Sequence, residues 1–313
     1  MVERTDIRRR KLVTGSAFET TKPSGGVPER PPTGAKPWRV SRMTDFSSRL
    51  AAAVAETGAP LCVGLDPDPA RLPSPFGATP QDAASFCIEI VAACQEAAAA
   101  FKPNLAFFEA WGAEGWRALE RVAGAVRQSG RLLVLDGKRG DIGNTGRRYA
   151  ASQFDALGAD AVTVAPYMGA DSLTPFLAHR GRCAFVLVAT SNPGADDLQR
   201  RLLGDAPLYR AVADLAAETA EREPGEVGFV VGGTRPAVLA ALRDAHPDVP
   251  FLVPGVGAQG GTAEGVVRCN NGGPMLVNSS RAVLYASPGA DFADAAREAA
   301  AALAADLGAA RVP

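Results

Sequence analysis

Short apolar and β-branched runs alternate along the chain with longer stretches in which hydrophobic residues recur at helical spacing. Eight runs are expected to be strands: Leu61–Leu65, Phe101–Leu105, Leu132–Leu135, Ala161–Ala165, Ala184–Ala189, Val227–Val231, Phe251–Val253 and Met275–Val277. Helices are expected at Ala83–Ala100, Trp116–Gln128, Thr145–Leu157, Leu208–Glu221, Pro236–Ala245, Thr262–Arg268 and Phe292–Leu307. Such alternation implies parallel strands with helices outside them. Eight units in about 250 residues favour a closed (β/α)₈ TIM barrel of the α/β class over a doubly wound sheet.

The first 42 residues lack this periodicity. They carry the basic run Arg8-Arg9-Arg10-Lys11 and then a stretch rich in Pro, Gly and Thr. We therefore expect a disordered extension over residues 1–42 and a single catalytic barrel domain over residues 43–313. No apolar segment follows the paired arginines, which argues against a twin-arginine signal. Met43, just before the first amphipathic helix, is a candidate start codon.

Composition narrows the class of protein further. The hydrophobic fraction of 47% supports one large core, and the formal net charge of −1 gives no basic field for nucleic acid. No apolar run approaches the roughly 20 residues needed to span a bilayer. The cysteines are odd in number and scattered: Cys62, Cys87, Cys94, Cys183 and Cys269. Buried free thiols in a reducing cytoplasm are the expected interpretation.

Charged side chains gather after the third predicted strand, in the segment Asp136-Gly137-Lys138-Arg139-Gly140-Asp141-Ile142-Gly143-Asn144-Thr145. Residues at i and i+2 of a strand share one face, so Asp136 and Lys138 should both point to the barrel mouth. Asp141 and Thr145 follow in the loop and at the start of the next helix. Surface charges at a strand-to-helix turn are an alternative, but three interspersed glycines favour close approach of a ligand.

Two further charged residues lie at the first two predicted strands. Lys102 lies within an apolar strand, where an unpaired ammonium would be costly, so a carboxylate such as Asp136 is its expected partner. Asp66 ends the first strand. For Asp66 alone, an Asx turn before Pro67 remains an alternative to a ligand-binding role. Because barrel active sites lie at the carboxyl ends of the strands, the placement itself indicates function.

Two later loops have the composition of a phosphate site. A glycine-rich loop, Pro254–Gly261, follows the seventh strand and contains Gln259, and Asn278-Ser279-Ser280-Arg281 follows the eighth. Glycine exposes backbone N–H groups to an anion, and arginine supplies a permanently charged fork. The loops after strands seven and eight frequently bind phosphate in barrels. The sequence therefore predicts a ligand with a phosphate at one end and an ammonium–carboxylate array at the other.

These motifs, taken in order, resemble the orotidine 5′-monophosphate decarboxylase family, in its longer form common among bacteria. The resemblance runs from about Asp45 to Leu307 and rests on these segments: Gly64–Pro67, Phe101–Asn104, Asp136–Thr145, Thr190–Ala195, Pro254–Gly261 and Arg281. It implies a lyase that decarboxylates orotidine 5′-monophosphate to UMP, the last step of pyrimidine nucleotide biosynthesis. It also implies no metal and no cofactor, and a cytoplasmic homodimer that uses neither nucleic acid nor membrane as a partner.

The resemblance also implies roles for individual residues at the reacting end. Lys138 would be the acid that protonates ring carbon C6, and Asp136 would lie against the substrate carboxylate. Lys102 would pair with Asp136 and, with Asp66, hold ribose hydroxyls. Asp141 would reach across a dimer interface into the partner's site.

The remaining roles concern substrate binding. Thr145 would accompany Asp141 across the interface, and Ser191 would hydrogen-bond the pyrimidine. Gln259 and Arg281 would bind phosphate. The family's tyrosine on the phosphate side has no obvious counterpart in this chain, so backbone amides would share that work.

Two other functions remain open from the sequence. A magnesium-dependent sugar-phosphate decarboxylase or hexulose-phosphate synthase of the same barrel group also carries an Asp-x-Lys-x-x-Asp string. A non-catalytic sensor of phosphate ligands would not require an intact Lys138. Loss of ultraviolet absorbance on adding orotidine 5′-monophosphate, with a chelator present, separates all three.

Overall fold

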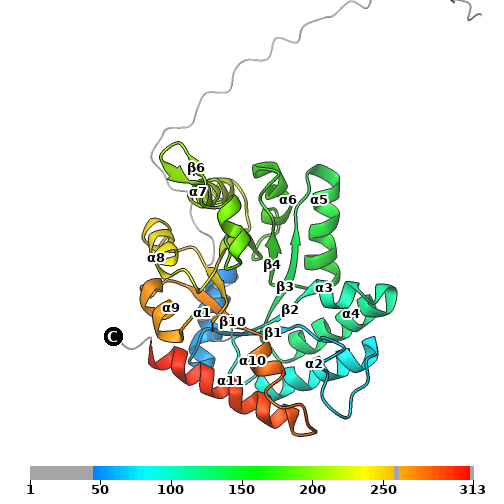
Figure 1. Cartoon of the computed structure of the whole chain (residues 1–313). Helices are drawn as coiled ribbons and strands as arrows, with labels where there is room; N and C mark the ends of the chain where they lie inside the picture. The colour runs from blue at the N-terminus through cyan, green and yellow to red at the C-terminus, as the bar shows by residue number, and fades with distance from the viewer. Residues whose placement is uncertain (1–44, 257–260, 311–313) are drawn as a thin grey trace, which may run out of the picture. The chain divides into compact units, whose positions relative to one another are not determined.

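Eight parallel strands close into a barrel in the computed structural model, which describes residues 45–256 and 261–310 (Figure 1). The barrel strands are β1 (Leu61–Leu65), β2 (Ala100–Pro103), β3 (Leu132–Arg139), β4 (Ala161–Val164), β5 (Cys183–Ala189), β8 (Glu226–Val231), β9 (Phe251–Pro254) and β10 (Met275–Ser279). Their order around the barrel is β1-β10-β9-β8-β5-β4-β3-β2, and every described neighbouring pair is parallel. The predicted TIM barrel is confirmed.

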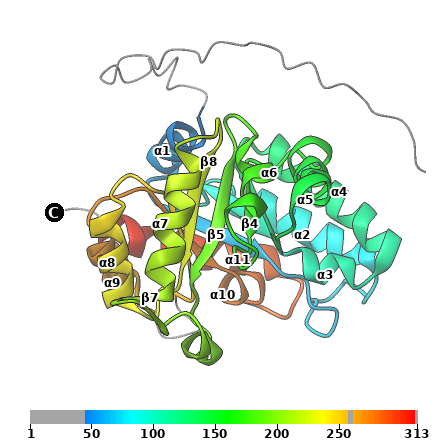
Figure 2. The same ribbon diagram turned by 90° about the horizontal axis from the view of Figure 1, so that it is seen from above.

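Helices surround these strands (Figure 2). The α-helices are α1 (Phe46–Thr57), α2 (Pro80–Cys94), α3 (Leu105–Glu109), α4 (Gly112–Gln128), α5 (Gly143–Ala150), α6 (Thr174–Leu177), α7 (Leu208–Ala220), α8 (Pro236–Ala245), α9 (Ala263–Asn270), α10 (Arg281–Leu284) and α11 (Phe292–Ala309). Shorter helical segments are the π-helical η1 (Ala151–Ala156) and the 3₁₀ turns η2 (Ala170–Ser172) and η3 (Pro193–Asp197). The predicted extension, residues 1–42, lies outside the described residues.

Several predicted boundaries were wrong, and β3, expected to end at Leu135, continues to Arg139. The helix expected over Ala83–Ala100 ends at Cys94, because Ala100 pairs with Cys62 and begins β2. The strand expected over Phe101–Leu105 stops at Pro103, since the Asn104 side chain caps α3 by accepting from the amide of Ala106. The helix expected over Thr145–Leu157 is α5 followed by the π-helical turn η1.

A small hairpin was not predicted. Strands β6 (Leu202–Leu203) and β7 (Ala206–Pro207) pair antiparallel after β5. Gly204 turns the chain between them with φ 64°, a left-handed conformation that favours glycine. Each strand of the hairpin has two residues, too few to show the alternation of apolar and polar residues from which strands are predicted.

Helix α1 packs across the amino-terminal ends of the barrel strands. Phe46 is fully buried and meets Phe185 of β5 edge to face, with ring centroids 5.7 Å apart. Leu50 joins the same apolar cluster, which also contains Cys62 and Leu276 from inside the barrel. The amino-terminal end of the barrel is therefore filled by α1, and the carboxyl end is left for a site.

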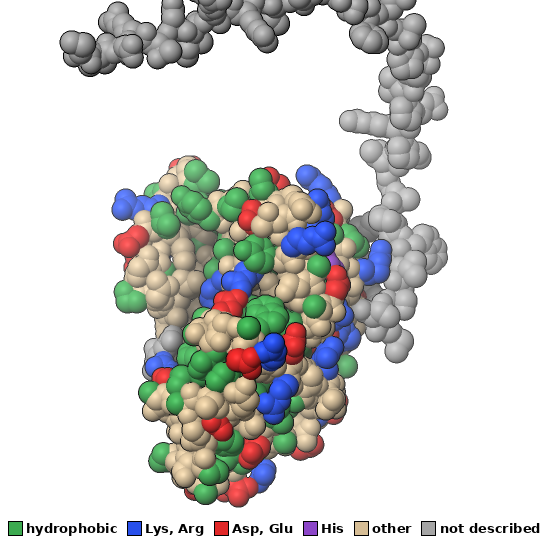
Figure 3. All heavy atoms as spheres, turned by 90° about the vertical axis from the view of Figure 1, so that its right-hand side faces the viewer, with side chains coloured by type: hydrophobic (Ala, Val, Ile, Leu, Met, Phe, Trp, Pro, Cys, Tyr) green, Lys and Arg blue, Asp and Glu red, His purple; other side chains and the backbone are tan. Residues whose placement is uncertain are grey.

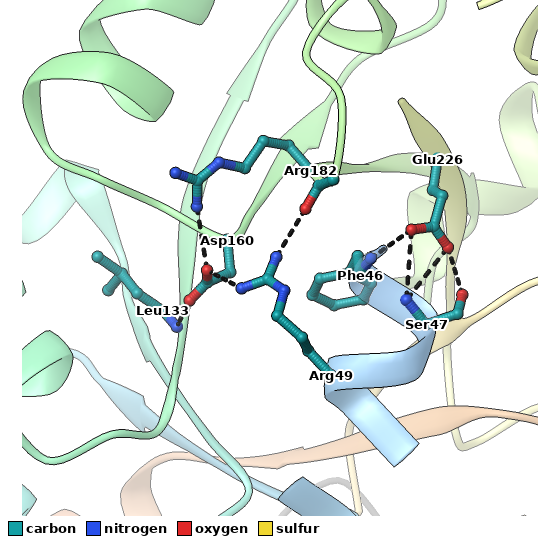
Figure 4. Close-up of polar contacts among 8 residues, drawn as sticks. Phe46, Ser47, Arg49, Leu133, Asp160, Arg182 and Glu226 are labelled. Carbon is teal, nitrogen blue, oxygen red and sulfur yellow. Dashed lines mark hydrogen bonds and ion pairs between the residues drawn. The ribbon is translucent and has the colours of Figure 1, made fainter. Parts of the chain in front are cut away.

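Two carboxylates fasten α1 to the barrel (Figure 4). Glu226 accepts from the backbone amides of Phe46 and Ser47, satisfying donors at the helix start. Asp160 pairs with Arg49 of α1 and with Arg182, the latter at 3.0 Å. Its second oxygen accepts from the amide of Leu133 at 2.8 Å, so the same side chain also holds the base of β3.

The cysteines are free, and four of them are buried: Cys62, Cys87, Cys94 and Cys183. Cys269 is partly exposed, so the expectation of buried free thiols is confirmed for four of five. Over residues 45–256 and 261–310, no helix combines the length and apolar character needed to cross a membrane.

Asp160→Ala should destabilise the barrel by about 2 kcal/mol, because two arginines and a backbone amide lose a largely buried acceptor. Urea unfolding measures the change. Asp294→Ala is the matched control, because its ion pair with Arg297 is exposed and should contribute less than about 1 kcal/mol. Equal losses in the two variants would contradict the assignment of Asp160 as the anchor.

Candidate active site

The carboxyl ends of β2 and β3 bring two lysines to one carboxylate. Lys102 Nζ lies 2.7 Å from Asp136 Oδ2, and Lys138 Nζ lies 2.5 Å from Asp136 Oδ1. Lys102 and Asp136 are buried, with 5% and 9% exposure, whereas the Lys138 side chain is 49% exposed. The expected pairing of Lys102 with Asp136 is confirmed. We refer to these three residues as the charged triad.

Regular strand alternation, from which Lys138 was expected to face the mouth, does not describe the end of β3. The pairing of β3 with β4 changes register between Leu135 and Arg139, and Lys138 has φ 47°. A non-glycine residue in this region costs roughly 1–2 kcal/mol and needs compensation. The amide of Lys138 supplies part of it by donating to Thr163 Oγ1 at 2.9 Å. The expected placement is right, but a local irregularity produces it.

Two members of the triad, Asp136 and Lys102, are held in their charged forms. Burial alone raises the pKa of Asp136, but the ammonium groups of Lys102 and Lys138 outweigh burial and hold that pKa well below its usual range. Burial lowers the pKa of Lys102, and Asp136 and Asp66 raise it to above its ordinary value. Because the Asp136 pKa is depressed on folding, its contribution to stability is complete above the unfolded pKa. That contribution is lost only as pH falls through the folded value.

Asp66 follows β1 and lies at the same end of the barrel. Its Oδ1 is buried and accepts no hydrogen bond from a described residue, so a hydroxyl donor from a ligand would satisfy it. Tyr285, which the sequence analysis did not single out, fixes this segment. Its hydroxyl donates to the Asp66 carbonyl at 2.8 Å and accepts from the amide of Asp68 at 2.7 Å. Burial raises the pKa of Tyr285 to about 12, which keeps the hydroxyl protonated.

A second unpaired acceptor lies on β10. Asn278 is 8% exposed, and its Oδ1 has no hydrogen-bond partner among the described residues. Gly64 on the adjacent strand β1 lies beside it, and a Cβ at Gly64 would approach Ser280 Oγ to 1.9 Å. Gly64 also pairs in register with Lys102. The missing side chain at Gly64 therefore lets Asn278 and Ser280 pack closely against β1, the strand next to the one that carries Lys102.

The remaining predicted binding residues follow other barrel strands. Ser191 comes two residues after β5 and packs beside Gly232, whose amide donates to the Ala189 carbonyl at 2.7 Å. Arg281 is exposed and begins α10 after β10. Gln259 lies outside the described residues. The sequence placed Ser191 and Arg281 at the correct end of the barrel.

Asp141 and Thr145 are not brought to the triad within one chain. Asp141 Oδ1 accepts from the neighbouring amide of Ile142 at 2.8 Å, and Thr145 is exposed in the first turn of α5. In the described part of the chain, neither side chain forms a hydrogen bond or ion pair with Lys102, Asp136 or Lys138, whose partners are one another and Thr163.

The donor set at this end of the barrel is one of ammonium groups, carboxylates and hydroxyls. Among residues 45–256 and 261–310, no group of three or more His, Cys, Asp or Glu side chains is placed to hold a metal ion. The arrangement can bind an anionic, hydroxylated ligand and can deliver a proton from Lys138.

The fold and the triad together define a barrel enzyme whose charged residues lie at the carboxyl ends of β2 and β3. The chain belongs to the orotidine 5′-phosphate decarboxylase / HUMPS family, whose sequence model matches residues 59–298.

Individual relatives agree with this assignment. An orotidine 5′-phosphate decarboxylase of Roseiflexus castenholzii is 53% identical over 244 residues, covering 77% of this chain and 89% of the relative. One from Verminephrobacter eiseniae is 47% identical over 261 residues, covering 81% and 94%. The solved structure of the Leishmania donovani OMP decarboxylase superposes with a TM-score of 0.74 at 40% identity, covering 86% of this chain and 99% of that one.

The two lysines should differ in what their loss does to stability. Lys102→Met should lower the free energy of unfolding by about 3 kcal/mol, because it leaves a buried carboxylate with one cation fewer. Lys138→Met should change that free energy by less than about 1 kcal/mol, since Lys138 is half exposed. Urea unfolding at neutral pH tests both. A larger loss in Lys138→Met than in Lys102→Met would contradict the burial argument.

Proposed function

We propose that this protein decarboxylates orotidine 5′-monophosphate to UMP, the last step of de novo pyrimidine nucleotide biosynthesis. The charged triad, Lys102–Asp136–Lys138, is the observation that carries the proposal. Relatives at 53% and 47% identity bear the name of this carboxy-lyase, and they are matched over 89% and 94% of their length.

The triad suits a decarboxylation that proceeds without an electron sink. Loss of carbon dioxide leaves a carbanion at ring carbon C6, which fixed positive charge must stabilise. Lys138 is suited to offset that charge and then to donate its proton, because its half-exposed side chain carries an ammonium group at the carboxyl end of β3. Asp136 is assigned to lie against the substrate carboxylate, and the two lysines keep it ionised.

Binding at the far end of the substrate supports the chemistry. Enzymatic rate gains correspond to roughly 8–23 kcal/mol, more than one lysine–carbanion contact supplies. Contacts to the phosphate by Gln259 and Arg281 offset the cost of bringing a second carboxylate near Asp136. Ser191 is assigned to the pyrimidine. Asp66, with its unpaired buried oxygen, is assigned with Lys102 to the ribose hydroxyls.

The two alternative functions are less well supported. The family name covers HUMPS as well, yet the relatives from Roseiflexus and Verminephrobacter, at 53% and 47% identity, are orotidine 5′-phosphate decarboxylases. A sensor without catalysis would have no use for a proton donor at Lys138, and Lys138 is paired with Asp136.

The activity is tested by loss of orotidine 5′-monophosphate absorbance with a chelator present, and turnover should survive exhaustive chelation. Lys138→Ala should lower kcat at least a hundredfold while UMP still binds, because proton donation contributes about 10²–10⁴-fold. Arg281→Ala is the companion variant and should mainly raise KM. Activity lost to EDTA and restored by Mg²⁺ would favour the sugar-phosphate alternative. A Lys138→Ala enzyme retaining over about a tenth of kcat would exclude Lys138 as the acid.

We further propose that two chains form a homodimer in which each site is shared. Asp141 and Thr145 are not hydrogen-bonded to the triad of their own chain, and large hydrophobic side chains in the segments that follow β3 and β4 are exposed: Ile142, Tyr149, Tyr167 and Met168. Figure 3 views the side on which α4 and α5 lie in Figure 1 and shows hydrophobic side chains among charged ones there. Large exposed apolar residues grouped in this way are typical of an interface.

Subunit exchange tests this arrangement. Lys138→Ala and Asp141→Ala homodimers, each nearly inactive, are mixed under conditions in which exchange is verified by co-purification of the untagged variant with the affinity-tagged one. If Asp141 acts in the partner's site, each mixed dimer contains one doubly damaged site and one intact site. With random pairing, about a quarter of all sites recover. Activity no higher than that of the parents after demonstrated exchange would exclude the shared site but not the decarboxylase function.

A cytoplasmic location is proposed as well. Its support is the free state of the cysteines, which suits a reducing compartment.

A further inference from the structure

One buried hydroxyl contacts two members of the charged triad. Thr163 lies in β4, is 1% exposed and faces the end of β3. Its Oγ1 accepts from the backbone amide of Lys138 at 2.9 Å. The same oxygen lies 2.9 Å from Asp136 Oδ1, the carboxylate oxygen that also receives the Lys138 ammonium.

The direction of these hydrogen bonds follows from what each group can do. The Lys138 amide can only donate, so the Thr163 oxygen accepts from it. Asp136 is ionised and can only accept, so the single Thr163 proton points to Asp136 Oδ1. The Thr163 hydroxyl therefore accepts one hydrogen bond and donates one. Asp136 receives three donors: Lys102, Lys138 and Thr163.

Packing does not explain this hydroxyl. Threonine and valine have nearly the same shape, so valine would fill the same space at position 163. Valine at position 163 would leave the partly buried Lys138 amide without its acceptor and the buried Asp136 carboxylate without one of its three donors. An unsatisfied buried polar group is costly, so a threonine at this place has an electrostatic use.

We propose that Thr163 is a positioning residue for decarboxylation: its hydroxyl fixes the backbone that carries the proton donor and the carboxylate that meets the substrate carboxylate. This inference rests on the proposed function. Without this hydroxyl, Asp136 would keep only its two lysine partners, and its orientation would be less constrained when an anion approaches. Lys138, held at φ 47°, would lose the bond that secures an unfavourable backbone conformation.

Three variants test the inference. Thr163→Val keeps the shape and removes the hydroxyl, and we expect kcat to fall about 10- to 100-fold. The affinity for UMP, measured by calorimetry, should stay within about threefold of wild type, because UMP has no carboxylate to meet Asp136. Thr163→Ser restores the hydroxyl and should recover kcat to within about fivefold of wild type. Should Thr163→Val fail to fold, Thr163→Ala takes its place in the comparison with Thr163→Ser.

Val164→Ala is the matched control. It removes buried volume from the same strand without contacting the triad, so its thermal midpoint should fall while kcat stays near wild type. Three results would overturn the inference: Thr163→Val with kcat within about threefold of wild type, Thr163→Ser as impaired as Thr163→Val, or Val164→Ala losing kcat equally. A wild-type protein inactive on orotidine 5′-monophosphate would instead refute the proposed function, so the two failures are distinguishable.

Discussion

One carboxylate shared by two ammonium groups is the interaction on which the barrel mouth depends. Asp136 is 9% exposed, and an isolated charge at that depth would lose too much hydration to remain ionised. Ion pairs with Lys102, inside the barrel, and with Lys138, at its rim, compensate for the hydration that Asp136 loses. Lys102 offsets the cost of burying the Asp136 carboxylate. Lys138, whose side chain is half exposed, supplies an ammonium group at the edge of the site.

A second buried cation, Arg243, has contacts typical of a charge with a structural role. Arg243 is 2% exposed and donates to the carbonyls of His246, Pro247, Val249 and Pro274 and to the Asn270 side chain. Its guanidinium also lies 3.7 Å from the centre of the Phe251 ring. Burial lowers its pKa to about 10, so it stays charged at neutral pH. Arg243 is surrounded by partners, whereas the Lys138 ammonium has one described partner and belongs to a side chain that is half exposed.

Sequence patterns predicted the strands because short β-branched runs bounded by polar residues leave little choice of structure. They also predicted where Asp66, Lys102, Asp136 and Lys138 lie, since side chains that follow parallel strands gather at one end of a barrel. They did not predict Thr163, because threonine in an apolar run is an ordinary strand former. Tyr285 was missed for another reason: its partner, Asp66, is 219 residues away in the sequence. The irregular end of β3 depends on such distant contacts and has no local signature.

Strand β3 is tied to the β4 segment by side chains at both of its ends. Asp160, just before β4, accepts from the amide of Leu133 at the base, and Thr163 accepts from the amide of Lys138 at the top. The register change between Leu135 and Arg139 lies between these two attachments. In evolutionary terms, β3, α5 and β4 form a module that has to be inherited whole. Recombination with a breakpoint between the two strands would combine β3 with a β4 segment that lacks the matching acceptors for the amides of Leu133 and Lys138.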